Sequence, residues 1–160
     1  MLFANRRWGR HATLALLCVL ALSAAAVPTA DPYALVLRGT TAKPFADVIQ
    51  ELEFAITERN FRITGRNTIG KSLRERGYTG FPEVEVIHFC NLENAREVLL
   101  LDPDYVALMP CRATARETPT GTAVSVMLLP ENVPDRRVRA FARRLNHQLR
   151  EIFEFVLQKN

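Results

Sequence analysis

Apolar and polar positions alternate along this chain with spacings that predict strands and helices in turn. Residues 33–40 (YALVLRGT) have the composition of a strand. From Pro44 onward, apolar residues recur at helical spacing as far as Ile56, which predicts an amphipathic helix. Residues 61–69 read as a second strand, and 70–77, between two glycines, as a short helical turn.

The segment 83–90 (EVEVIHFC) has a clear period of two, as in a strand with two distinct faces. The two predicted faces are Val84, Val86, His88 and Cys90 on one side, and Glu83, Glu85, Ile87 and Phe89 on the other. We expect the face with Cys90 to point into the core.

A helix is predicted directly after this strand, with Asn91 as its N-cap, and it ends at Asp102 before a proline. Residues 105–117 (YVALMPCRATARE) are predicted to form a strand with Cys111 on the core face and Arg112 on the opposite face. The turn TPTG then predicts a hairpin, with residues 122–130 pairing back on that strand.

A long helix over residues 135–158 closes the chain, with an apolar stripe on one side and arginines over most of the rest. Helices and strands are mixed in the chain order, and the clear hairpin is antiparallel. The pattern therefore predicts an α+β fold, a two-layer domain with helices packed on a mixed or antiparallel sheet.

The first 26 residues predict a secretory signal peptide rather than part of the fold. Three arginines precede about fifteen apolar or small residues, and Ala24 and Ala26 fit the positions read by a signal peptidase. That run is shorter than the roughly 20 residues needed to span a bilayer. We expect export to the bacterial periplasm without stable membrane insertion, a flexible lead over 27–32, and a single domain over 33–160.

Removal of that signal changes the charge of the chain. The full sequence has 21 basic and 17 acidic residues, but residues 1–26 hold three arginines and no acids, which leaves 18 against 17. The mature chain is nearly neutral, so we expect no nucleic-acid partner.

Phe155 and Leu157 widen the apolar stripe of the last helix, which favours a subunit interface.

Two short motifs resemble the family called domain of unknown function 302. The Cys-Asn pair at 90–91 opens a helix, and the Pro-Cys-Arg run at 110–112 begins a strand followed by a turn and a last strand. The resemblance covers residues 44–130, with Leu92 departing from the proline that many relatives carry there. It implies a small α+β domain that is often a homodimer, and it implies no reaction.

Removal of the signal leaves Cys90 and Cys111 as the only cysteines, an even number in an oxidising compartment. A disulfide between them would close a loop of the chain and stabilise the fold by roughly 3 kcal/mol. Alternatively they are a redox-switchable pair, inert buried thiols, or a catalytic thiol at Cys90, whose pKa the adjoining helix N-terminus would lower.

Other side chains near the cysteines are candidates for ligand binding. His88 lies on the same predicted strand face as Cys90, and Met109 lies on the same predicted face as Cys111. Such soft donors suit copper(I), zinc or haem iron. Their spacing matches no standard zinc motif, so no cofactor is predicted, with haem or copper as the alternatives. Asn91 and Arg112 adjoin the cysteines in sequence and complete the set of ligand-binding candidates.

Taken together, these patterns predict an exported accessory domain that binds a small ligand or senses redox state without turnover, centred on Cys90 and Cys111. Two alternatives remain open from the sequence. One is a thiol-dependent enzyme or sulfur carrier that uses Cys90, and the other is a structural, dimer-forming protein.

Overall fold

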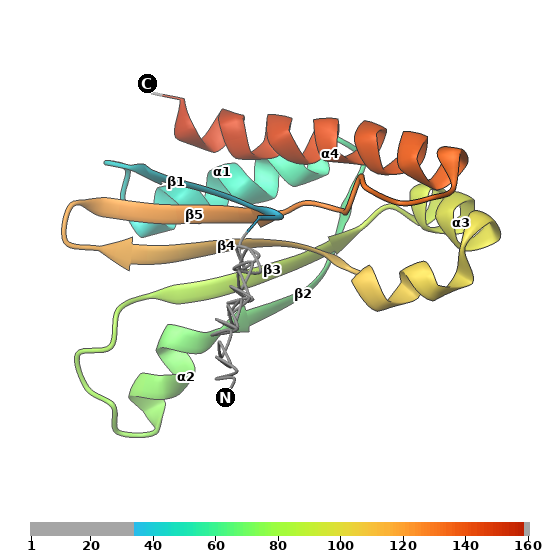
Figure 1. Cartoon of the computed structure of the whole chain (residues 1–160). Coiled ribbons are helices and arrows are strands. Elements are labelled where there is room, and N and C mark those ends of the chain that lie inside the picture. Colours follow the sequence, from blue (N-terminus) through green and yellow to red (C-terminus); the bar gives the residue numbers. More distant parts are fainter. Residues whose placement is uncertain (1–33, 159–160) are drawn as a thin grey trace, which may run out of the picture. The chain divides into compact units, whose positions relative to one another are not determined.

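The computed structural model describes residues 34–158, in which five strands, four α-helices and one 3-10 helix follow one another (Figure 1). The predicted signal peptide and the lead over 27–32 lie outside the described residues. The elements are β1 (Val36–Thr41), α1 (Phe45–Thr57), β2 (Arg62–Thr68), α2 (Ile69–Glu75), β3 (Val84–Cys90), α3 (Leu92–Leu101), the 3-10 helix η1 (Pro103–Leu108), β4 (Cys111–Thr118), β5 (Gly121–Met127) and α4 (Arg136–Leu157).

The five strands form one sheet in the order β1-β5-β4-β3-β2, and every neighbouring pair is antiparallel. The predicted hairpin is β4–β5, closed between Thr118 and Gly121. Gly121 has φ +137°, and a Cβ atom there would lie 2.1 Å from the carbonyl oxygen of Thr41, so both the turn and the adjoining chain require glycine.

Helices α1 and α4 lie side by side over one face of the sheet (Figure 1), which confirms the predicted α+β class with helices on an antiparallel sheet. Each helix turns an apolar stripe inward, with residues such as Leu52 and Ile56 from α1 and Phe141 and Leu149 from α4. The sheet meets them with Ile87, Phe89, Ala113, Ala115, Val124 and Val126, all buried. This apolar layer is the core of the domain.

The core face of β3 is the opposite of the one expected. Ile87 and Phe89 are buried, whereas His88 and Cys90 on the other face are only partly buried. The expectation is wrong because Glu85 occupies the core face and is only 6% exposed. The guanidinium of Arg66 on β2 forms an ion pair with the Glu85 carboxylate. This pairing compensates the negative charge of a glutamate that would otherwise be expected in solvent.

The predicted strand over 105–117 is also shorter than expected, because its first part is helical. Asp102 accepts a hydrogen bond from the backbone of Asp104 at 3.1 Å and caps η1, which has Pro103 in its first turn. Strand β4 then begins only at Cys111, after Pro110, which has no backbone N–H to donate to a sheet. This places η1 beside the end of the sheet, where it helps to enclose a pocket.

Asn146 of α4 fixes the segment that follows β5. Its side chain is buried, donates from Nδ2 to the carbonyl of Leu129 at 2.9 Å and accepts at Oδ1 from the Leu129 amide at 2.8 Å. These two hydrogen bonds satisfy the backbone amide and carbonyl of Leu129, which is no longer part of the sheet. Within residues 34–158, no helix is long and apolar enough to cross a membrane.

Candidate functional site

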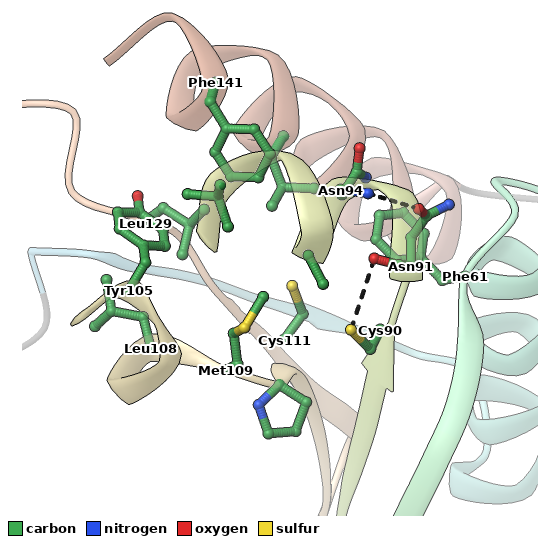
Figure 2. A pocket seen from close by; sticks show the side chains of 14 residues that line it. Phe61, Cys90, Asn91, Asn94, Tyr105, Leu108, Met109, Cys111, Leu129 and Phe141 are labelled. Atoms are coloured by element: carbon green, nitrogen blue, oxygen red, sulfur yellow. Dashed lines mark hydrogen bonds between the residues drawn. The ribbon is translucent and has the colours of Figure 1, made fainter. Parts of the chain in front are cut away.

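A small pocket lies at the end of the sheet, between the C-terminal end of β3, helix α3, η1 and helix α4 (Figure 2). Its cavity has a volume of about 20 Å³, which is room for a single water-sized guest. The lining is mostly apolar. The residues that line it are Phe61, Cys90, Asn91, Asn94, Ala95, Val98, Tyr105, Leu108, Met109, Pro110, Cys111, Leu129, Phe141 and Leu145.

The strand register brings Cys90 and Cys111 to this pocket. Phe89 is paired directly with Cys111, so Cys90 is one position further along the neighbouring strand. Cys111 is the first residue of β4 and shares the core face with Ala113, while Cys90 is the last residue of β3. Both thiols are free, and Figure 2 shows both sulfur atoms facing the same space. The expected disulfide is therefore absent from the described structure.

Burial keeps both thiols protonated. Desolvation raises the pKa of Cys111 to about 12, and the proximity of Cys90 adds to the shift. Burial also raises the pKa of the Cys90 thiol, against the lowering expected from the helix N-terminus. The cause is desolvation of the thiol. Asn91 accepts from the backbone at the start of α3, and the Cys90 thiol donates to the Asn91 carbonyl at 3.7 Å.

Two of the four ligand-binding candidates line the pocket. Met109 lies between η1 and β4, and it lines the pocket together with Cys90 and Cys111 (Figure 2). Asn91 has a structural role, because its Oδ1 accepts from the Asn94 amide at 3.0 Å and its Nδ2 donates to the Asn60 carbonyl at 2.9 Å. These bonds fix the start of α3 over the cysteines.

The other two candidates, His88 and Arg112, do not line this pocket. They are paired across β3 and β4 and lie on the sheet face that α1 and α4 leave uncovered. Asn67 donates from Nδ2 to His88 Nε2 at 3.3 Å, while the Arg112 guanidinium contacts the sulfur of Met127. His88 shares its strand face with Cys90, as predicted, but it lies two positions before the end of β3 and is not among the residues that line the pocket.

Tyr105 is a pocket residue that the sequence analysis placed only as the first residue of a predicted strand. Its side chain is 5% exposed, and its hydroxyl has no hydrogen-bond partner in the described part of the chain. Burial, together with Asp102 and Cys111, raises the pKa of this hydroxyl. In Figure 2 the hydroxyl points away from the sulfur atoms. No sequence signal distinguishes this tyrosine from an ordinary core aromatic residue.

Over residues 34–158, no three side chains among His, Cys, Asp and Glu converge into a metal-binding group. The sulfur atoms around the pocket belong to Cys90, Met109 and Cys111. Two thiols and one thioether are one donor short of the usual tetrahedral zinc site, whose four ligands are thiolates, imidazoles or carboxylates. The pocket thus offers soft, neutral sulfur donors in an apolar enclosure.

The fold and this pair of cysteines define a small α+β domain of a family without an assigned activity. The family profile described as domain of unknown function DUF302 matches residues 38–156, and the chain belongs to this family. This confirms the resemblance drawn from the Cys-Asn and Pro-Cys-Arg motifs. No curated protein matches the chain.

The same fold is found in a crystal structure of an uncharacterized conserved protein DUF302 from Bacillus stearothermophilus. The two structures agree with a TM-score of 0.68 at 15% sequence identity, and the alignment covers 77% of this chain and 98% of the other. At this identity the likeness establishes the architecture of the domain and carries no activity with it.

Proposed function

We propose that this protein is an exported accessory domain without turnover, and that Cys90 and Cys111 form a reversible dithiol–disulfide pair that reports redox state. The single observation that carries the proposal is the convergence of both thiols on one pocket. In the described structure both thiols are free, and in the reduced state of the proposed switch they stay so. In the oxidised state a sulfur–sulfur bond replaces the two S–H bonds.

The strand register supports bond formation between the two cysteines. Residues paired directly across antiparallel strands have Cα atoms roughly 5 Å apart, and each step along a strand adds about 3.4 Å. Cys90 is one step from the residue paired with Cys111. The two Cα atoms are therefore about 6 Å apart, within the range that a disulfide spans. By strand parity the two side chains start on opposite faces, but Cys90 is the last residue of β3 and both side chains line the same pocket. Closure of the bond therefore requires the end of β3 to adjust.

The protonation of the thiols supports slow, thermodynamically favoured oxidation. In thiol–disulfide exchange proteins with a low cysteine pKa, the folded protein stabilises the thiolate. Because this stabilises the reduced state, the disulfide of such a protein is a strong oxidant. Here burial raises the pKa of both thiols, so the reduced state gains no such stabilisation. Few thiolates are present near neutral pH, which slows attack on a disulfide. These properties favour a pair that responds to sustained changes in its surroundings.

The same protonation weighs against the thiol-dependent enzyme or sulfur carrier at Cys90. A catalytic cysteine needs a thiolate near neutral pH, and this usually comes from a neighbouring cation or a helix N-terminus. The pKa of Cys90 is raised instead, and the cap of α3 is occupied by Asn91. The other sequence-based alternative, a structural dimer-forming protein, is compatible with the fold but leaves the two converging thiols without a role.

A small-molecule disulfide such as oxidised glutathione supplies the test. In the expected reaction each of the two protein thiols loses its proton and the pair loses two electrons, while the small disulfide is reduced to two thiols. Peptide mapping after oxidation of the purified mature chain should show Cys90 joined to Cys111 within one chain. The oxidised chain should also unfold at a higher temperature by several degrees, since the bond closes a loop.

The matched control is the Cys90→Ser variant, which keeps Cys111 and the pocket but has no bonding partner. It should show no internal link and no increase in unfolding temperature under the same treatment. If the native chain instead forms only mixed disulfides or links between chains, the switch is excluded. Retention of both free thiols at equilibrium with a strongly oxidising glutathione buffer would exclude it equally.

A further inference from the structure

The pocket combines three sulfur donors with a cavity the size of one atom. Cys90, Met109 and Cys111 all line it, and Figure 2 shows their sulfur atoms at the same end of the space. The volume of about 20 Å³ admits a single water-sized guest and no organic ligand of ordinary size. A single ion is a guest of this size for which the three sulfur atoms are suitable ligands.

From this juxtaposition we propose that the dithiol state binds one soft monovalent metal ion, copper(I) or its analogue silver(I), through the sulfur atoms of Cys90, Met109 and Cys111. Thiolate and thioether ligands select copper(I) over harder divalent ions. The site goes beyond the proposed redox switch but uses the same dithiol, because a disulfide has no thiolate to offer. Oxidation of the pair would thus release the metal.

The surroundings of the sulfurs favour a monovalent ion. The rest of the lining is apolar apart from two asparagines and a tyrosine, and neither Asn91 nor Tyr105 is positioned as a ligand. Two thiolates and one thioether around a single positive charge leave a net charge of −1, whereas a divalent ion in the same site would lack a fourth donor. The raised pKa values mean that the metal must displace protons in order to bind.

Binding is therefore an exchange of protons for metal with no change of oxidation state. Copper(I) forms bonds to the two cysteine sulfurs and to the methionine sulfur. Each cysteine S–H bond breaks, and its proton passes to solvent. The metal remains copper(I) and no electron is transferred, so no reductant or oxidant takes part once copper(I) has been supplied.

The test is a competition for copper(I) between the reduced mature chain and a coloured copper(I) chelator under anaerobic conditions. We expect one copper per chain, with two protons released per copper in weakly buffered solution. The Met109→Leu variant should lose at least about 10-fold in affinity, since one ligand is missing. Cys90→Ser and Cys111→Ser should lose considerably more.

Met127 supplies the matched control. It lies on the uncovered face of the sheet, where its sulfur contacts Arg112, and it is 37% exposed. Met127→Leu should bind copper with the affinity of the native chain. Circular dichroism and thermal unfolding of each variant without metal show whether a variant has lost its fold or only a ligand. Silver(I) in place of copper(I) repeats the binding measurement with an ion that air does not oxidise.

The outcomes separate the two proposals. A chain that forms the Cys90–Cys111 disulfide but fails to compete for copper(I) and silver(I) retains its redox role and overturns the metal site. Binding that is unchanged in a folded Met109→Leu variant, or that releases no protons, also overturns the site. Binding of copper by a chain that forms no disulfide would support the metal site and exclude the switch.

Discussion

At the scale of single residues, the properties of the candidate site arise from desolvation. Cys111 is the more deeply buried thiol, and Phe89, paired with it across the strands, is fully buried in the core. The sequence placed both cysteines on strands, but it did not reveal their protonation, because that depends on which elements cover the strand ends. Nor did it reveal that Glu85 lies inside, since its compensation by Arg66 depends on strand pairing.

The raised pKa of Cys111 predicts a loss of stability at alkaline pH. The folded state keeps a proton that the unfolded state releases above about pH 8.5. The contribution is thus fully present below that pH and is lost as pH rises towards the folded pKa of about 12. Urea unfolding at pH 8 and pH 10 should show the reduced native chain losing about 1–2 kcal/mol more than Cys111→Ala. Equal losses would mean that Cys111 is not desolvated.

The pairing of Arg66 with buried Glu85 predicts an asymmetric response to mutation. Arg66→Ala leaves a charge inside the fold without compensation, and since Arg66 itself is partly exposed we expect a cost of about 1–3 kcal/mol in urea unfolding. Lys71→Ala, which removes the exposed pair with Glu75, should cost less than about 0.5 kcal/mol. The double variant Arg66→Met, Glu85→Leu should recover much of the loss. A similar cost for Arg66→Ala and Lys71→Ala would contradict the buried role of Glu85.

At the scale of elements, most of the helices and strands follow from periodicity, and the exceptions have local causes. The α1 and α4 stripes, the β4–β5 hairpin and the α3 cap at Asn91 are all visible in the sequence and confirmed in the structure. The segment η1 was missed because its apolar residues also fit a strand, while the Asp102 cap and Pro110 favour a helical turn before β4. The pocket exists because η1 and α3 enclose the strand ends.

Helix α3 shields the cysteines, so its N-cap should control their accessibility. Asn91→Ala removes the acceptor for the Asn94 amide and the donor to the Asn60 carbonyl, and it should cost about 1–2 kcal/mol of stability. Labelling of Cys90 by a small alkylating reagent should become several-fold faster. Asn91→Asp keeps the cap and serves as the control, with a smaller increase. Unchanged labelling of Asn91→Ala would show that α3 does not cover the thiol.

At the scale of the whole molecule, residues 34–158 form a five-stranded antiparallel sheet with α1 and α4 over one of its faces. The class and the family were both accessible from the sequence, through the alternation of elements and the two cysteine motifs. The strand order was not accessible from the sequence, because it brings β1 beside β5 and places β1 and β2 at opposite edges of the sheet. Such pairings between distant segments are decided by the shared core rather than by local pattern.

Export remains a prediction for the chain as a whole. Residues 1–26 carry the features of a signal peptide, so the protein recovered from the exported fraction should begin at Val27. N-terminal sequencing or intact mass determines this directly. We also expect two chains per particle by light scattering, as the family resemblance implies. A product that retains residue 1 would contradict processing, and a single chain at all concentrations would contradict the dimer.

The most direct test of the central claim is a crystal structure of the mature chain after equilibration with a small-molecule disulfide. The account predicts a sulfur–sulfur bond of about 2.05 Å between Cys90 and Cys111, inside the pocket enclosed by α3 and η1. Sulfur atoms that stay well apart after this treatment would contradict it.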